Sequence, residues 1–285
     1  MNKIPISVII LTFNEEKNIT ACLDSIGHHF EKVFMVDSGS NDDTLNIVKN
    51  YPVEVIQHPF ENYSKQRNWA FKNLPIQTEW ILNMDADHRL TPEIITELAF
   101  QFKQGISQSI NGMLASRKTL FMGKWIKYGG HYPTYHAVIF RNGKGFCEDK
   151  LYDQHFKVDG EVLKLNGDII DLITESLSTF TLRHDKWSGL EALEQFEKQK
   201  INDATIKGSL TSKNPIAKRR YIKNIYERFP LFVRPALYFF IRYFLRLGFL
   251  DGRRGLIFHF LQCFWFRFLI DAKIYELRKT RNENK

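Results

Sequence analysis

Two aspartates, Asp85 and Asp87, end the stretch that the apolar run Trp80–Leu82 begins. An apolar run of this kind is typical of a buried strand. Two carboxylates one residue apart repel each other, and removing them from water costs free energy. A divalent cation that prefers oxygen ligands, Mg2+ or Mn2+, would neutralise both. The simpler alternative is a pair of aspartates in a solvated turn.

Other polar residues could act together with this pair, and each also has a simpler explanation. Asp37 has the position of an acidic residue that holds a ribose or a base, or it only stabilises the turn DSGS. Arg67 offers a guanidinium fork for a diphosphate, or it is a solvated charge on a helix. One carboxylate of Glu148-Asp149 could be a general base, although such pairs are mostly loop residues. His184 is a candidate metal or phosphate ligand, although a lone histidine is more often structural.

Alternating strand-like and helix-like segments would position these residues. Strands are predicted at 7–13, 32–37, 53–58 and 79–85, and helices at 15–26, 42–51, 63–74 and 91–102. Thr91 would cap the last helix, with Pro92 in its first position. This alternation predicts an α/β fold with a mostly parallel sheet and helices on both faces.

The candidate residues fall where the predicted strands end. Thr12 and Asn14 close the first strand, Asp37 the second, and Asp85 and Asp87 the fourth. Ligands of parallel sheets bind at the carboxyl ends of the strands, so a common site is expected there. The chain has neither GxGxxG nor GxxxxGK[ST], which argues against a Rossmann dinucleotide site and a P-loop.

The rest of the composition narrows the class of protein. Cys22, Cys147 and Cys263 are far apart and form no CxxC pair, which argues against a zinc site or disulfide framework and fits a reducing cytoplasm. The N-terminus reads as a first strand and not as a signal peptide. Residues 111–171 are rich in glycine and aromatics, which predicts extended strands and loops facing an acceptor. A surface helix is expected over 187–208, and a linker over 207–215.

The C-terminal segment 213–285 differs from the rest of the chain. It carries 17 Lys+Arg against 5 Asp+Glu and 17 of the 40 aromatic residues, so its net charge of +12 exceeds the +8 of the whole chain. Its two apolar stretches are interrupted by charged or polar residues: Arg234, Arg242, Arg246, His259 and Arg267. Helices that lie in the interface of an anionic membrane are therefore expected rather than spans. The alternatives are an ordinary helical subdomain or a dimer interface, and nucleic-acid binding is disfavoured because the aromatics form dense apolar blocks.

Five motifs in order make the chain resemble a known family. They are SVIILTFNEEKNI, MVDSGSNDDT, SKQRNWA, WILNMDADHRLTPE and CEDKLYDQHF. Together they resemble the inverting family 2 glycosyltransferases, and most of all the branch of lipopolysaccharide-core β-glucosyltransferases and related capsule and exopolysaccharide enzymes. The resemblance implies a GT-A fold, a Rossmann-like domain that binds a nucleotide-sugar.

The resemblance also implies a role for individual residues. Arg67 would lie near the base or diphosphate of the donor, and Asp149 would be the catalytic base. Asp85 and Asp87 would form the DxD motif, with Asp87 the direct metal ligand and Asp85 near the ribose and the metal. The nucleoside pocket would be lined by Thr12, Asn14, Glu15 and Asp37.

Two positions depart from the family pattern. His88 stands where relatives often carry an acid, and we expect it to affect the acceptor or the local charge more than catalysis. Leu11 replaces a common proline, which we expect to be harmless.

The resulting hypothesis is a cytoplasmic glycosyltransferase, peripherally bound to the inner face of the bacterial membrane, that moves a sugar from a nucleotide-sugar such as a UDP-sugar to a lipid-linked or lipopolysaccharide or capsule glycan. Its predicted domains are 1–212, with a donor half to about 110 and an acceptor half beyond, and 213–285 for membrane association. Two alternatives stay open. A sugar nucleotidyltransferase would need a glycine-rich loop that LTFNEE lacks, and a membrane-docking scaffold would have a degenerate donor pocket.

Overall fold

The computed structural model describes residues 3–173, 176–197, 206–212 and 214–283. They divide into two compact units. The first unit comprises Met1–Arg117, Tyr135–Asp149 and Gln154–Asp171, and the second Lys118–Thr134, Lys150–Asp153 and Leu172–Lys285. The predicted domain limits at 212 and 213 stay a prediction.

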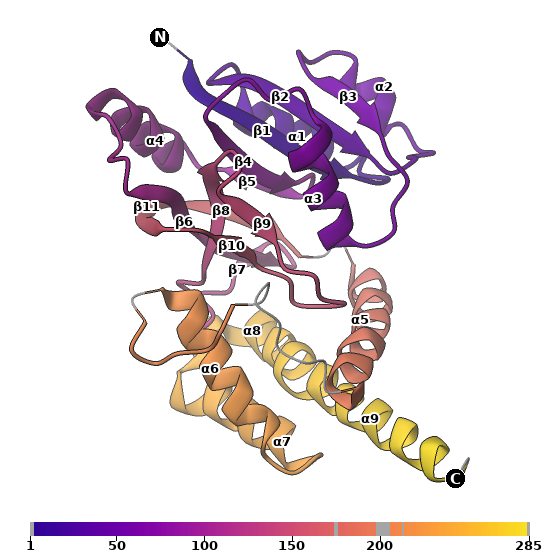
Figure 1. The fold of residues 1–285 in the computed structure, drawn as a ribbon. Coiled ribbons are helices and arrows are strands. Elements are labelled where there is room, and N and C mark those ends of the chain that lie inside the picture. Colours follow the sequence, from indigo (N-terminus) through magenta and orange to yellow (C-terminus); the bar gives the residue numbers. More distant parts are fainter. Residues whose placement is uncertain (1–2, 174–175, 198–205, 213, 284–285) are drawn as a thin grey trace. The chain divides into compact units, whose positions relative to one another are not determined.

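The first four strands form the parallel half of the sheet (Figure 1). They are β1 (Ile4–Thr12), β2 (Phe30–Asp37), β3 (Glu54–Gln57) and β4 (Trp80–Asp85), in the order β3-β2-β1-β4. All four predicted strands are confirmed, with ends shifted by up to three residues. The register pairs Thr12 with Asp37 and Leu11 with Asp85, so the candidate residues share one edge of the sheet.

The other half of the sheet is antiparallel. The order continues from β4 through β8, β6 and β11 to β5. The bounds are β5 (His88–Leu90), β6 (Ile110–Phe121), β7 (Lys124–Trp125), β8 (Tyr135–Arg141) and β11 (Glu161–Leu172), and β9 (Gly145–Cys147) and β10 (Phe156–Val158) form a separate pair. The mostly parallel sheet that the sequence predicted is therefore wrong beyond β4. No helix connects β6 to β8, and strands joined without a crossover helix pair antiparallel.

Helices cover both faces of the parallel half, as predicted. They are α1 (Ile19–Ile26), α2 (Thr44–Val48), α3 (Tyr63–Asn73) and α4 (Pro92–Gln104). The Thr91 hydroxyl caps α4 by accepting the Ile94 N–H, which confirms the predicted start. The helix predicted over 42–51 begins two residues later, because Asp42 and Asp43 hydrogen-bond with Glu16 of the loop after β1, and Asp42 Oδ1 accepts the Thr44 N–H where α2 begins.

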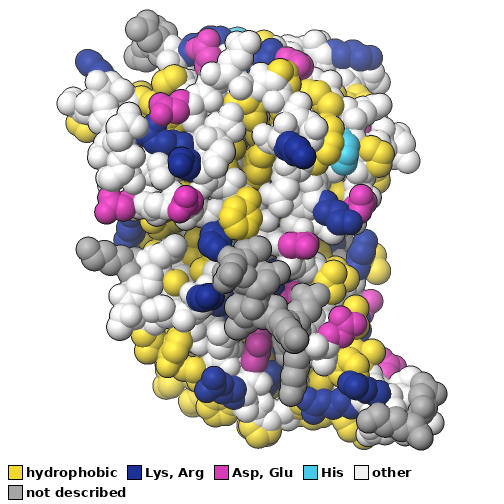
Figure 2. Space-filling model, in the orientation of Figure 1, with side chains coloured by type: hydrophobic (Ala, Val, Ile, Leu, Met, Phe, Trp, Pro, Cys, Tyr) yellow, Lys and Arg dark blue, Asp and Glu magenta, His cyan; other side chains and the backbone are white. Residues whose placement is uncertain are grey.

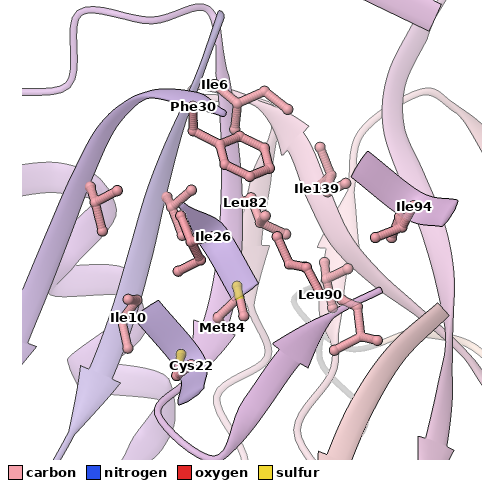
Figure 3. Packing of buried hydrophobic residues seen from close by; sticks show 14 of the residues in the cluster. Ile6, Ile10, Cys22, Ile26, Phe30, Leu82, Met84, Leu90, Ile94 and Ile139 are labelled. Carbon is pink, nitrogen blue, oxygen red and sulfur yellow. The ribbon is translucent and has the colours of Figure 1, made fainter. Parts of the chain in front are cut away.

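The core explains why these helices form. α1 buries Ile19, Cys22, Leu23 and Ile26, which its 3.6-residue period places on one face. Figure 3 shows Cys22 and Ile26 against Ile10 and Met84 of the strands. On the opposite face of the sheet, Ala70 of α3 and Leu74 pack with residues of β1 and β2.

The second unit is mainly helical. Its helices are α5 (Leu177–Glu197), α6 (Pro215–Glu227), α7 (Val233–Phe240), η1 (Ile241–Leu245), η2 (Gly248–Asp251), α8 (Gly252–His259), η3 (Phe260–Trp265) and α9 (Phe266–Glu283). The helix predicted over 187–208 begins ten residues earlier, and 198–205 lie outside the described residues. Residues 206–212 form neither helix nor strand, in agreement with the predicted linker.

One helical stretch of this unit is long. Among the described residues, Gly248–Glu283 is the one helix long and apolar enough to cross a membrane by length and composition, and 39% of its apolar window is buried. Phe266, Ile270 and Ile274 of α9 pack against Ala192 of α5. One face of this helix is therefore covered by protein.

Candidate active site

Two loops at the carboxyl edge of the sheet hold each other through backbone N–H groups. The N–H of Asn14 donates to Ser40 Oγ at 2.9 Å, and the N–H of Glu15 donates to Thr44 Oγ1 at 2.8 Å. In return the N–H of Asn41 donates to Asn14 Oδ1 at 2.8 Å. Asn14 adopts a φ of 54°, a left-handed conformation that asparagine tolerates better than most residues. These hydrogen bonds thus hold the loop FNEE and the loop SGSND against each other.

Thr12 and Asp37, which are paired across β1 and β2, differ in whether their side chains have hydrogen-bond partners. Asp37 is fully buried and accepts the N–H groups of Gly39 at 2.9 Å and Ser40 at 3.0 Å, together with the Ser40 hydroxyl. The turn role that the sequence suggested is therefore observed. Thr12 Oγ1 is buried, and no described group hydrogen-bonds to it. A buried polar atom of this kind is costly unless a ligand or water supplies the partner.

Helix α3 connects three loops of the first unit. Its cap is Asn62, whose side chain accepts the Lys65 N–H. Gln66 reaches Ser38 Oγ at 3.3 Å and the His58 carbonyl at 3.1 Å, which ties α3 to the loop after β2. Asn68 binds the backbone of Cys147 twice, donating to its carbonyl at 2.9 Å and accepting its N–H at 2.8 Å.

Arg67 lies between these two residues and pairs with Asp85. Its Nη2 donates to the Met84 carbonyl at 2.9 Å and to Asp85 Oδ1. Burial alone would raise the pKa of Asp85, but the positive charges of Arg67 and Arg117 hold that pKa below its usual value. Nη1 of Arg67 is buried and has no hydrogen-bond partner in the described part of the chain. The pair therefore keeps one guanidinium donor for a further group.

His88 supports the two aspartates of the DxD sequence. Its Nδ1 accepts the Asp85 N–H at 3.1 Å, so in the neutral ring the proton is on Nε2. Nε2 lies 3.6 Å from Asp85 Oδ2, 3.9 Å from Asp87 Oδ1 and 4.0 Å from Asp171 Oδ1. Burial lowers the pKa of His88, which favours this neutral ring. Its N–H therefore faces three carboxylates at distances longer than a hydrogen bond.

The ligand atoms of Asp85, Asp87 and His88 lie within 4.8 Å of one another. Asp85 and Asp87 are half-buried, so their oxygens keep access to solvent. Two carboxylates fit a hard cation such as Mg2+ or Mn2+. With its Nε2 protonated, His88 would support such a site from behind and not ligate the ion.

The two neighbours Glu148 and Asp149 differ in burial. Glu148 is fully buried, and its Oε2 accepts the His155 N–H at 3.0 Å. Asp149 is exposed, with Oδ1 3.4 Å from Ser64 Oγ of α3. Glu148 therefore anchors the loop while Asp149 presents its carboxylate to solvent, as a base that meets a substrate must.

His184 lies in the second unit and has a different environment. It stacks on Phe180, and its Nδ1 and Nε2 lie 2.8 Å from the Phe180 carbonyl and from Gln262 Oε1. Burial lowers its pKa to about 4. Both ring nitrogens are engaged within the unit, so nothing here supports His184 as a metal ligand.

Sequence reasoning missed Ser64, Gln66, Asn68, Arg117 and Asp171. The available signal was SKQRN itself, since all five of its side chains can form several hydrogen bonds and a surface helix rarely needs so many. Arg117 lies 3.5 Å from Asp171, and β11 places Asp171 opposite His88. The pairing of β11 with β5, which the sequence did not reveal, brings Asp171 and its partner Arg117 to the site.

Comparison with known proteins agrees with this arrangement of residues. The model of glycosyl transferase family 2 matches residues 7–144, which include the strand ends and the DxD sequence. Residues 7–144 are a family 2 glycosyltransferase domain. The chain thus carries a glycosyltransferase domain, and its α/β sheet agrees with the fold that the motifs implied.

The glycosyltransferase is similar over its whole length to two curated proteins. It is 26% identical to the lipopolysaccharide core biosynthesis glycosyltransferase LpsC of Rhizobium meliloti, over 96% of this chain and 93% of that protein. It is 27% identical to an uncharacterized glycosyltransferase of Rickettsia typhi, over 97% and 89%. The structure of S. aureus TarS residues 1–349 with UDP-GlcNAc aligns with 98% of this chain and 92% of that chain, at 16% identity and a TM-score of 0.49. This distant likeness adds nothing to the assignment.

Proposed function

We propose that the glycosyltransferase moves a sugar from a UDP-sugar to a glycan of the lipopolysaccharide or capsule class, with inversion at the anomeric carbon. The observation that carries the proposal is the carboxyl edge of the parallel strands. There Thr12 Oγ1 and Arg67 Nη1 are buried with no partner in the described part of the chain, on the same edge as Asp85 and Asp87. The acceptor class rests on the likeness to LpsC.

Each residue has a distinct part in the proposed reaction. Thr12, Asn14 and Glu15 line the proposed nucleoside pocket, and Asp37, which is buried, fixes the turn beside it. Arg67 Nη1 donates to the diphosphate, whose negative charge grows as the bond to the sugar breaks. Asp85 and Asp87 would hold Mg2+ or Mn2+, which when bound supplies positive charge against the same leaving group.

Asp149 is the proposed general base. It removes the proton of the acceptor hydroxyl while that oxygen attacks the anomeric carbon from the face opposite the diphosphate. The new glycosidic bond forms, the bond to the diphosphate breaks and UDP leaves. Exposure of Asp149 and burial of Glu148 favour Asp149 as the residue that meets the acceptor.

Calorimetric titration with UDP, with and without Mn2+, tests the donor site. We expect binding that strengthens with Mn2+ and an Asp87→Ala variant that loses this dependence. A variant that keeps it would contradict the role of Asp87. If the wild type binds no nucleotide in a panel of UDP, GDP, CDP and dTDP, the scaffold alternative would be favoured.

A second variant separates chemistry from binding. Asp149→Asn keeps the size of the side chain but removes the base, so we expect transfer to fall by roughly 10²- to 10⁴-fold while the affinity for UDP stays within about twofold. Product assays with lipopolysaccharide or capsule fragments would measure it. Unchanged turnover would exclude Asp149 as the base.

A further inference from the structure

The second unit exposes a continuous row of aromatic rings. Each ring lies within 6.4 Å of the next, measured between centroids, in the order Phe240, Phe244, Phe239, Phe260, Phe264, Phe268, Phe232 and Tyr275. We call this row the aromatic face. Exposed fractions at Phe232, Phe240, Phe244 and Tyr275 run from 39% to 59%. Soluble proteins rarely expose contiguous apolar surface of this kind unless something binds it.

The segment Phe244–Leu250 extends the aromatic face with aliphatic side chains. Leu245 is 65% exposed, Leu250 50% and Leu247 46%. Leu247 also has a φ of 60°, a conformation that costs a branched, bulky residue of the order of 1 kcal/mol or more. Phe232 has a φ of 66°, and its N–H is fixed by Asp271 Oδ2 at 2.7 Å. The fold thus maintains strained backbone at exposed apolar side chains.

Basic side chains accompany this apolar surface. Arg246, Arg253 and Arg254 are exposed, and none forms an ion pair with another described residue. Figure 2 shows hydrophobic and basic side chains next to one another over the helices of this unit. With a net charge of +12 for residues 213–285, the complementary partner is anionic as well as apolar. Nucleic acid offers the charge but no apolar layer.

A helix that spans the bilayer does not fit the contacts of Gly248–Glu283. Asp271 is fully buried and accepts from Nε of Arg234 at 2.8 Å, so a charged pair lies in the middle of α9. The other face of α9 packs on α5. Crossing the bilayer would expose this polar pair to lipid or strip α5 from the helix, and both are costly.

We propose that the aromatic face and the segment Phe244–Leu250 insert into one leaflet of an anionic membrane, with Arg246, Arg253 and Arg254 at the headgroups. Aromatic rings and arginines are the side chains that favour this depth. The inference concerns the second unit alone and does not depend on which sugar is transferred. It predicts a monotopic enzyme that reaches membrane-bound substrates without a transmembrane helix.

Sedimentation of the full chain with vesicles tests the proposal. We expect binding to vesicles of phosphatidylglycerol and phosphatidylcholine, and little binding to phosphatidylcholine alone. Leu245→Ser with Leu247→Asn should weaken binding by about tenfold or more, because two exposed apolar side chains are lost. Asparagine tolerates the left-handed conformation at 247, so this variant should unfold at the same temperature as the wild type or higher. The matched control is Leu182→Ser on α5, a residue that is 74% exposed and outside the proposed surface, and it should bind like the wild type.

The charge is tested separately. Arg253→Gln with Arg254→Gln should weaken binding to the anionic vesicles by roughly ten- to thirtyfold, since each nearby arginine contributes about 1 kcal/mol. Equal vesicle binding by the wild type and the Leu245/Leu247 variant would overturn the proposal. So would a wild type that ignores vesicles but forms dimers that this variant abolishes, which would assign the face to a second copy. Retention in membranes after alkaline carbonate would assign a span instead.

Discussion

Each unit contains a buried arginine paired with an aspartate, and the two pairs differ in what they leave free. Arg234 in the second unit uses Nε and Nη2 on Asp271, Nη1 on the Glu227 carbonyl and Nη2 on Gln195. Arg67 in the first unit uses Nη2 on Asp85 and on the Met84 carbonyl, and its buried Nη1 finds no described partner. Asp271 is fully buried, whereas the Asp85 side chain is 35% exposed. A complete pair stabilises the fold, and an incomplete, partly open pair can bind a ligand.

Breaking the complete pair should have the largest effect. Arg234→Met leaves Asp271 buried without a counter-charge, and we expect the free energy of unfolding to fall by about 3–5 kcal/mol. Urea unfolding followed by circular dichroism measures this loss. The control is Arg228→Met, an exposed arginine close by, which should change stability little. A loss below 1 kcal/mol for Arg234→Met would show that the pair is not structural.

Breaking the open pair should affect binding more than stability. Arg67→Met removes the free Nη1 donor, and we expect the affinity for UDP to fall by about 10- to 100-fold, because a hydrogen bond to a charged group contributes about 1.5–3 kcal/mol. The loss of stability should be smaller than for Arg234→Met, since Asp85 keeps contact with water. Calorimetry with UDP measures the affinity, with the exposed Lys72→Met of the same helix as control. Unchanged affinity would place the diphosphate elsewhere.

Acid should act on the second unit through buried histidines. Burial lowers the pKa of His184 and His259 to about 4 and that of His131 to about 3, from about 6.5 in the unfolded chain. Between these values the unfolded state binds more protons, so stability is present above pH 6.5 and is lost as the pH falls toward 4. The slope is about 1.4 kcal/mol per pH unit for each histidine. Urea unfolding at pH 7, 6 and 5 would show the loss, and His184→Gln should reduce the slope. A slope that His184→Gln leaves unchanged would contradict the assignment.

The parallel half of the first unit could be predicted from the sequence because its signals are local. β4 is an apolar run, α1 has a helical period and α4 begins with Thr91 and Pro92, and each feature is fixed by neighbouring residues. The extended strands over 111–171 were predicted, but their antiparallel pairing was not, because the pairing of β11 with β5 joins residues about 80 positions apart. Such a distant strand partner cannot be inferred from loop length or composition.

The candidate site was predicted in part for the same reason. The strand ends marked Thr12, Asp37, Asp85 and Asp87, and the structure places them on one edge. The sequence left open which of two roles Asp37 takes, although the contacts of its turn and the contact of His88 with the Asp85 N–H join residues only two or three positions apart. His184 is a chemically suitable residue whose ring is engaged by packing and by hydrogen bonds within its own unit.

Helix α3 has a consequence for how this enzyme can change. Arg67 and Asn68 follow Ser64 by three and four positions, about one helical turn. In the order Ser64, Arg67 and Asn68, they contact Asp149, Asp85 and Cys147. A helix of eleven residues moves as a single body, so the proposed diphosphate contact at Arg67 and the proposed base Asp149 depend on the position of the same helix. We therefore expect that replacing one of these three residues disturbs the alignment of both proposed groups. A new donor geometry would require all three residues to change together.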